Sequence, residues 1–275
     1  MGKTILMCAP DFFDVEYEIN PWMHVANPVD ARVAMTQWHR LRATYAKVEW
    51  DVCLIDPVAH LPDMVFTANG GLVIGNRVAL PTFREPERQG ESHYFRQWFE
   101  SRGYELLQPT HDFEGEGDAL LWNDVIFAGY PWRSDKASHP ELAEFFGKRV
   151  VSLQLTDARF YHLDTALTIV GTDTVALFPG AFTADSVRTV RDIVPDVIEA
   201  ELADALAYGL NAASDGRSIV LSDGATGLIE GYRARGLDVH PTPIGEFQKS
   251  GGGVKCLSLE LRRNGDAASH VGGDG

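Results

Sequence analysis

Short apolar segments recur along this chain in pairs, and the regular spacing of these pairs is the feature that most constrains its fold. The pairs occupy residues 71–80, 119–128 and 166–178, and each is interrupted by turn residues. Such pairs predict β-hairpins, and a fixed period of this length predicts repeated structural units. The equivalent leucines of the three pairs stand 48 and 47 residues apart: Leu72, Leu120 and Leu167.

The same period extends to the end of the chain with looser spacing. Apolar runs at residues 218–221 and 254–259 bring the number of units to about five. Amphipathic segments with helical periodicity lie between the strand pairs, at residues 30–48, 91–102 and 184–208. Strands and a helix in each unit predict an α/β fold of five blades around an axis, with pseudo-fivefold repeats. An ordinary α/β sheet with accidental spacing is the alternative.

Polar residues stand at matching places in these units. They lie just before or within the first strand, and in a radial architecture equivalent strand positions meet at one central spot. We therefore expect these residues to form one site: Asn69, residues 114–118, His162 with Asp164, and Cys256.

The composition limits the partners that this chain can have. Its 275 residues, 45% of them hydrophobic, suffice for one large domain or two of ordinary size. Lys and Arg number 24 against 39 Asp and Glu, and the formal net charge of -15 argues against nucleic acid or an anionic membrane as a partner. The charge favours a cationic partner, although solubility alone also explains an acidic surface.

The N-terminus and the cysteines indicate the compartment. No stretch approaches the roughly 20 consecutive apolar residues of a membrane span, and the start turns polar at Pro10-Asp11, too early for a signal peptide. We therefore expect a cytoplasmic protein. The three cysteines are far apart and form no Cys-x-x-Cys pair, so neither a disulfide framework nor a zinc knuckle is predicted: Cys8, Cys53 and Cys256.

Cys256 has the surroundings of a reactive cysteine. Residues 251–253 are three glycines, which let the backbone approach a ligand closely and expose N–H groups. Lys255 is a neighbouring cation that can help to hold a thiolate. A buried structural cysteine at the start of a strand is the alternative.

His162 and the acidic run at residues 113–118 are candidates for acid/base chemistry. Strand alternation puts His162 and Asp164 on one face, and a histidine paired with a carboxylate is a candidate base. The acidic run holds three carboxylates among glycines, which suits binding a cation or orienting an imidazole. A solvated acidic turn or a weak metal loop is the alternative, but no histidine-rich ligand set accompanies it, so no metal is expected.

Four motifs together resemble the guanidino-group-modifying superfamily of the pentein fold. This group includes arginine deiminases, dimethylarginine dimethylaminohydrolases, amidinotransferases and arginine dihydrolases. The resemblance spans residues 4–262, and residues 7–23 look closest to the arginine dihydrolase and dimethylarginine dimethylaminohydrolase-like branch. The motifs are residues 62–69, the Glu-Gly-x-Gly-Asp run, residues 162–165 and residues 251–258.

The resemblance implies a fold and a domain organisation. We expect a five-bladed β/α propeller with the site on its axis, residues 1–265 forming a single catalytic domain. Residues 266–275 are expected to be a flexible tail. A small cationic guanidino compound is the expected partner, without nucleic acid or membrane, and a homo-oligomer is left open.

It also implies roles for individual residues. Cys256 would attack the guanidinium carbon, His162 would act as acid/base, and no cofactor is needed. Glu114 is favoured over Glu116 as the carboxylate that orients His162, because the acidic run has one residue more than the Glu/Asp-Gly-Gly-Asp usual in the family. Asp164, with Asp118 or Asp63, would hold the cation. The other expected substrate-binding residues are Asn69, Phe66, Asn20, Arg84, Arg88 and Arg133.

Asn69 decides which reaction we favour. The deiminases carry an arginine and an aspartate where Ala68 and Asn69 stand here. Loss of that negative charge would let a neutral ureido intermediate stay bound and be attacked again, which favours an arginine dihydrolase that forms ornithine, CO2 and ammonia. A dimethylarginine dimethylaminohydrolase or arginine deiminase that gives citrulline is the runner-up, and an amidinotransferase is less favoured. A non-catalytic pentein-fold binding protein is the alternative from a different class.

Overall fold

The computed structural model describes residues 2–262, and within them the strands form five small sheets of three strands each. In every sheet the central strand pairs antiparallel with one neighbour and parallel with the other. The sheets are β15 (Leu259–Glu260), β1 (Thr4–Cys8) and β2 (Asp51–Ile55); β3 (Leu72–Ile74), β4 (Arg77–Ala79) and β5 (Glu105–Leu107); β6 (Ala119–Trp122), β7 (Val125–Tyr130) and β8 (Arg149–Gln154); β9 (Leu167–Ile169), β10 (Thr174–Leu177) and β11 (Asp196–Glu199); β12 (Ala213–Ser214), β13 (Ser218–Ser222) and β14 (Asp238–Thr242).

The three predicted hairpins are confirmed. Leu72 pairs with Ala79, Leu120 with Phe127, and Leu167 with Leu177, so each leucine starts or nearly starts an equivalent strand.

The last two units differ from the prediction. Residues 218–221 belong to the middle strand β13, because the first strand of this unit, β12, has only two residues and gives no apolar run. Residues 254–259 were expected to be a strand, but only Leu259 belongs to β15. The residues before it form a turn, so Cys256 precedes the strand.

Seven α-helices lie within the described residues: α1 (Ala31–Lys47), α2 (Glu91–Glu100), α3 (Ser138–Phe146), α4 (Ala184–Ile193), α5 (Leu202–Leu206), α6 (Thr226–Ala234) and α7 (Gly245–Gln248). The predicted helices at residues 30–48 and 91–102 are confirmed as α1 and α2. The single helix expected at residues 184–208 is wrong. Pro195 follows the end of α4, and a proline disfavours the helical conformation of the residue before it. The chain therefore leaves the helix and forms β11 before α5 begins.

The helix α1 shows how the sequence builds these elements. Asp30 caps its N-terminus by accepting from the backbone N–H groups of Arg32 and Val33. Its buried residues follow the helical period and face the sheets: Ala34, Trp38, Leu41 and Tyr45.

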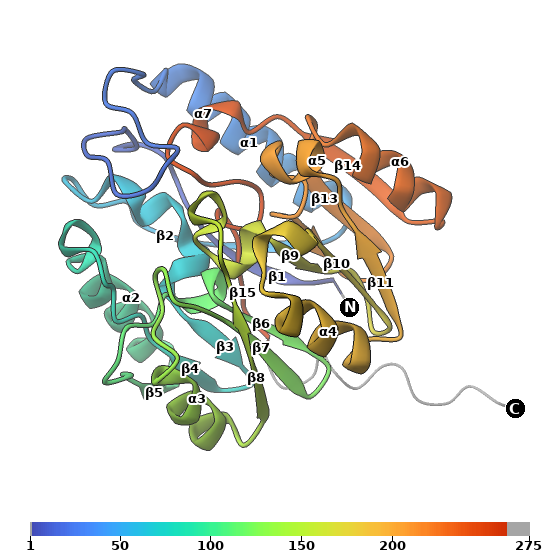
Figure 1. The fold of residues 1–275 in the computed structure, drawn as a ribbon. Helices are drawn as coiled ribbons and strands as arrows, with labels where there is room; N and C mark the ends of the chain where they lie inside the picture. Colours follow the sequence, from blue (N-terminus) through green and yellow to red (C-terminus); the bar gives the residue numbers. More distant parts are fainter. Residues whose placement is uncertain (1, 263–275) are drawn as a thin grey trace, which may run out of the picture.

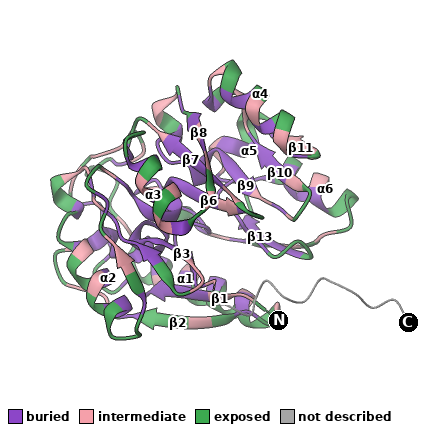
Figure 2. Ribbon diagram, turned by 90° about the horizontal axis from the view of Figure 1, so that it is seen from below, coloured by how far each residue is buried: buried purple, intermediate pink, exposed green. Residues whose placement is uncertain are grey.

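Helices α2, α3, α4 and α6 lie at the periphery of the molecule, and strands such as β3, β6 and β13 are mostly buried (Figures 1 and 2). The first strands of successive sheets are neighbours, since β6 contacts β9 and β9 contacts β12. No helix within residues 2–262 is long and apolar enough to cross a membrane. The expected tail at residues 266–275 lies outside the described residues.

Short 3-10 turns stand before the first strands of three sheets, and they meet one another. They are η2 (Thr67–Gly70) before β3, η4 (Gly115–Gly117) before β6 and η6 (Leu163–Thr165) before β9. η4 contacts both η2 and η6. Polar residues on these turns are thereby brought from distant parts of the sequence to one place.

Close packing of these turns predicts that they tolerate no added side chain. In Gly70→Ala the new Cβ would lie 2.3 Å from a carbon of the buried Phe95 ring, so we expect the melting temperature to fall. Gly231→Ala is the control, because its Cβ meets nothing within 4 Å on helix α6. Alanine is the better helix former, so this variant should be as stable as wild type or more stable. Thermal unfolding measures both, and equal melting temperatures for the two variants would contradict the packing argument.

Candidate active site

One polar residue from each of the five units occupies the same place, two or three residues before the first strand of its sheet. The spacings along the chain are 47, 48, 47 and 45 residues. All five side chains are buried, and direct contacts join the last three of them: Asn69, Glu116, Asp164, Asn211 and Cys256.

Cys256 lies at the centre of these contacts. Its side chain is buried, with Sγ 3.4 Å from Asp164 Oδ2 and 3.1 Å from Asn211 Nδ2. Burial and the Asp164 carboxylate raise the pKa of the thiol well above its ordinary value, while the Gly253 backbone N–H and the Asn211 amide act in the opposite direction. Ionisation of this thiol is therefore disfavoured in the free site.

His162 and Glu114 form a buried pair. Glu114 Oε2 lies 2.8 Å from His162 Nε2 and 3.4 Å from Arg133 Nη1. Burial would raise the pKa of Glu114, but Arg133 and His162 outweigh it and lower this pKa to about 2. Glu114 thus stays ionised and holds the imidazole. His162 precedes η6 and so lies in a turn, not on the strand face that alternation predicted.

Glu116 has a different environment. It pairs with Lys255 and Arg262 and accepts the backbone N–H of Glu260. The Lys255 ammonium group also donates to the carbonyl of Ser258. The expected role of Lys255 beside the thiolate is thus not supported, because its charge is directed to Glu116.

A small pocket opens beside Cys256 and His162, next to the segment around Asn20. Eight of its lining residues were expected from the sequence: Asn20, Asp63, Phe66, Asn69, Arg88, Arg133, His162 and Cys256. Five more complete the wall: Ile19, Tyr161, Ser250, Gly251 and Gly252.

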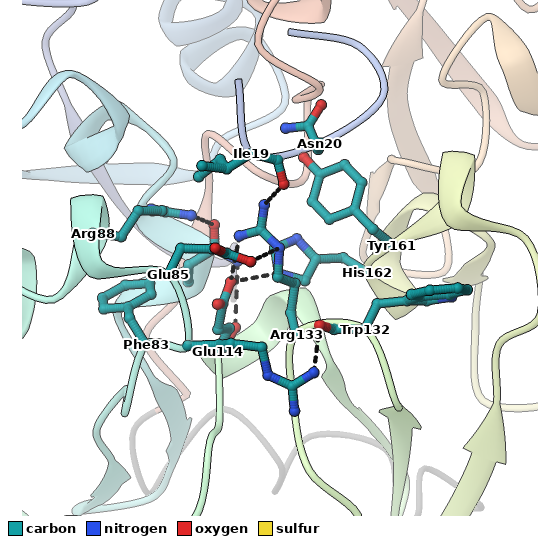
Figure 3. Close-up of polar contacts among 12 residues, drawn as sticks. Ile19, Asn20, Phe83, Glu85, Arg88, Glu114, Trp132, Arg133, Tyr161 and His162 are labelled. Carbon is teal, nitrogen blue, oxygen red and sulfur yellow. Dashed lines mark hydrogen bonds and ion pairs between the residues drawn. The ribbon is translucent and has the colours of Figure 1, made fainter. Parts of the chain in front are cut away.

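Arginines and their partners form one wall of this pocket. Arg133 donates to the carbonyl of Ile19 at 2.8 Å and lies over the ring of Tyr161 (Figure 3). Arg88 binds both oxygens of Glu91 and donates to Asn69 Oδ1, each at 2.8 Å.

Polar partners also fix the remaining wall residues. Asp63 accepts from Tyr17 and from Ser250 at 3.0 Å each. Asn20 Nδ2 donates to the carbonyl of Ser250. Phe66 packs its ring against Gly252, where a Cβ would come within 2.0 Å of it, so this position needs glycine.

Four expected residues do not line the pocket: Arg84, Glu114, Asp118 and Asp164. Glu114 and Asp164 contact the lining residues His162 and Cys256, whereas Arg84 and Asp118 have other partners. Arg84 is partly exposed, pairs with Asp112 at 2.8 Å and donates to the carbonyls of Pro131 and Trp132. Asp118 is buried, but it accepts from Ser134 Oγ and from the backbone N–H of Leu163. Asp118 therefore supports the turn that carries His162 rather than facing a ligand.

Two carboxylate oxygens at the site lack a hydrogen-bond partner among the described residues. They are Oε1 of Glu114 and Oδ1 of Asp164, and both are buried. Burial raises the pKa of Asp164 to about 7, which outweighs the opposing effect of Lys255. A buried acceptor without a donor is costly, so both oxygens are suited to a ligand that brings N–H groups. No group of three or more histidine, cysteine or carboxylate side chains within residues 2–262 is arranged to hold a metal ion.

Three contributors escaped the sequence analysis: Tyr161, Glu91 and Asn211. Tyr161 donates to the carbonyl of Gly251 at 2.7 Å, and Glu91 holds Arg88. No spacing rule identifies these two. Asn211 follows Asp164 by 47 residues, so the repeat itself contained the signal, which the short β12 concealed.

Comparison with known proteins gives close relatives. The family model for eukaryotic N,N dimethylarginine dimethylhydrolase matches residues 23–263. N(G),N(G)-dimethylarginine dimethylaminohydrolase of Mycobacterium tuberculosis is 44% identical over 94% of this chain and 86% of its own length. The bifunctional arginine dihydrolase/ornithine cyclodeaminase ArgZ of Synechocystis is 41% identical over 94% of this chain, which spans 37% of that protein.

Solved structures agree with these relatives. The N-terminal domain of ArgZ, with a cysteine replaced by serine and substrate bound, superposes with a TM-score of 0.91 at 40% identity. The match covers 95% of this chain and 98% of that one. DDAH from Pseudomonas aeruginosa has a TM-score of 0.79 at 18% identity over 94% of this chain and 99% of its own, and shares the fold.

The raised pKa of Asp164 predicts a pH-dependent cost to stability. This pKa is about 7 in the folded chain against an ordinary 3.8, so the folded state binds the proton more tightly. The resulting stabilisation is complete below about pH 4 and is lost as the pH rises through 7. Asp164→Asn cannot ionise, so near pH 8 it should melt at a higher temperature than wild type, and the difference should shrink toward pH 4.

The control for this prediction is Asp223→Asn, at an exposed aspartate. Its difference from wild type should stay constant over the same pH range. Parallel melting curves for Asp164→Asn and wild type at every pH would contradict the assigned burial cost.

Proposed function

This chain belongs to the N,N dimethylarginine dimethylhydrolase family, and from that premise we propose that it is a cysteine hydrolase cleaving C–N bonds of the guanidino group of free L-arginine or Nω-methylated arginine. The observation that carries the proposal is a pair of unpartnered buried oxygens: Asp164 Oδ1, on the carboxylate that contacts Cys256, and Glu114 Oε1, on the carboxylate that contacts His162. A guanidinium group is a planar cation with N–H donors along its edges, which is the chemistry that such acceptors require.

The proposed first step is attack by Cys256 on the guanidinium carbon. Binding of the cation beside Asp164 compensates that negative charge and lowers the pKa of the thiol, which burial otherwise raises. The thiol passes its proton to His162, the thiolate adds to the carbon, one C–N bond breaks, and the departing amine takes that proton from His162. The product of this step is a thiouronium on Cys256.

Hydrolysis completes the cycle. His162, held by Glu114 at 2.8 Å, takes a proton from water, which attacks the same carbon and displaces the sulfur. The carbon leaves as a neutral ureido group, and His162 passes its proton to the displaced sulfur, which restores the thiol. Because these side chains are buried, fixed protein dipoles and charges, rather than bulk solvent, stabilise the charge that develops on the reacting groups.

We favour the arginine dihydrolase among the possible reactions. Asn69 presents a neutral amide to the pocket, and its oxygen is occupied by Arg88. Because Asn69 carries no negative charge, the site does not favour a cation over the neutral ureido product at this position. The ureido product therefore has no electrostatic reason to leave before a second attack. That attack would release ornithine, CO2 and ammonia. One-step hydrolysis to citrulline, as in a dimethylarginine dimethylaminohydrolase or arginine deiminase, is the alternative.

Arg133 and Arg88 are the proposed partners of the substrate carboxylate. Both line the pocket, whereas Arg84 is occupied by Asp112 outside it. Asp63, Phe66 and Asn20 complete the proposed binding wall.

The architecture is part of the same proposal. We infer that the five sheets are the blades of a β/α propeller and that residues 1–265 act as one catalytic domain. The meeting of η2, η4 and η6 supports a common axis. The cysteines of the described chain are free, which supports a reducing, cytoplasmic compartment: Cys8, Cys53 and Cys256. A homo-oligomer is compatible with this arrangement.

Product analysis tests the proposal directly. Wild-type protein is incubated with arginine and with dimethylarginine, and the products are identified by mass spectrometry. We expect ornithine and ammonia from arginine, and no product from Cys256→Ser, because a serine hydroxyl is a far poorer nucleophile than a thiolate. The control Cys53→Ser changes an exposed cysteine and should keep full activity. Citrulline alone would select the one-step alternative, and no product from either compound would favour a non-catalytic binding protein.

Separate exchange of the two glutamates tests the orientation of His162. Glu114→Gln should lower kcat by roughly 10²-fold or more, since a misoriented acid/base loses most of its usual contribution. Glu116→Gln leaves His162 untouched, so it should lower the melting temperature more than kcat. A larger loss of kcat in Glu116→Gln would reverse the assignment.

A further inference from the structure

Asn211 contacts both the backbone and the sulfur of Cys256, yet it has no part in the reaction proposed above. It lies between α5 and β12, fully buried. Its Oδ1 accepts the backbone N–H of Cys256 at 3.0 Å. Its Nδ2 donates to Cys256 Sγ at 3.1 Å and to the Asp164 carbonyl at 3.2 Å.

These contacts leave the amide only one orientation. A backbone N–H can only donate, so it must meet Oδ1, and a carbonyl can only accept, so it must meet Nδ2. The second N–H of the amide then points at sulfur. Rotation of the amide by 180° would oppose donor to donor at Cys256 and acceptor to acceptor at Asp164.

The sulfur consequently has to accept a hydrogen bond. A thiolate accepts far better than a thiol, and a hydrogen bond to a charged form favours that form. The backbone reinforces the arrangement, because Lys255 N–H donates to the Asn211 carbonyl at 3.2 Å. A Cβ at Gly253 would lie 2.7 Å from Asn211 Oδ1, so glycine is needed there for the amide to fit.

We propose that Asn211 is a positioning residue for the nucleophile, holding the Cys256 backbone with its oxygen and stabilising the thiolate with its amide N–H. The inference rests on the proposed role of Cys256. Burial and the Asp164 carboxylate oppose ionisation of this thiol, and the Asn211 amide joins the Gly253 backbone N–H as a neutral donor that favours it. A neutral donor stabilises the thiolate without repelling the cationic substrate, as a lysine or arginine there would.

The test separates this donor from a purely structural role. Asn211→Asp keeps an oxygen for the Cys256 N–H but replaces the donor to sulfur with an acceptor. Alkylation of Cys256 by iodoacetamide, followed by mass spectrometry of its peptide, reports the thiolate fraction at each pH and needs no guanidino substrate. The groups that also face the sulfur or its pocket remain unchanged in the variants: Asp63, Arg88, Arg133, Tyr161, His162, Asp164 and Tyr208.

We expect the midpoint of alkylation to move upward by about one unit or more in Asn211→Asp, as loss of a hydrogen bond to a charged group implies. kcat should fall at least about tenfold at neutral pH, with a smaller change in KM. Asn211→Ala, which removes the donor without adding a charge, should shift the midpoint in the same direction. Asn123→Asp is the matched control, since this exposed amide donates only to a backbone carbonyl of Thr172, and its midpoint should equal that of wild type.

Several results would overturn the inference. An unmoved midpoint in a folded Asn211 variant would show that the amide does not act on the sulfur, whether or not turnover is lost. Failure of both Asn211 variants to fold would assign the residue to structure alone. A wild type without turnover would instead refute the proposed function, while a shifted midpoint would still support the action of Asn211 on the thiol.

Discussion

Burial of ionisable side chains with too few partners is the constraint on which the site depends. Cys256, Asp164 and Glu114 are each nearly inaccessible, and two of their carboxylate oxygens have no donor among the described residues. Such an arrangement costs folding free energy, because desolvated acceptors and charges are unfavourable. A bound guanidinium group would offset the cost by supplying N–H donors and positive charge. Desolvation thus destabilises the free protein and, for the same reason, favours binding of the cation.

The repeated turns make this burial possible. Each turn brings one polar residue inward, two or three positions before a short strand, and packing of the turns leaves little space around them. Gly70 against Phe95 and Gly252 against Phe66 show how closely the backbone approaches its neighbours. Ion pairs such as Lys255 with Glu116 neutralise the charges that face away from the pocket. Asp164, which contacts Cys256, keeps one oxygen without a partner among the described residues.

Much of this arrangement is readable in the sequence, and the failures have physical causes. Paired apolar runs predicted the hairpins, and their period of 47 to 48 residues predicted the repeated units. Motif resemblance selected Cys256, His162 and Glu114, which the structure brings near one another. The sequence did not reveal β12, because a two-residue strand leaves no apolar run. Arg84 and Arg88 look equivalent in the sequence, and only the folded chain separates the arginine at the pocket from the one paired with Asp112.

The central claim is that the guanidinium carbon becomes covalently bound to one cysteine. It is tested by acid-quenching the protein during turnover of arginine labelled at the guanidino carbon and determining the masses of its cysteine peptides. The account predicts a labelled adduct on the Cys256 peptide, with the mass of arginine less one ammonia, and unmodified peptides for Cys8 and Cys53. Release of labelled product without any adduct on Cys256, or an adduct on another cysteine, would contradict it.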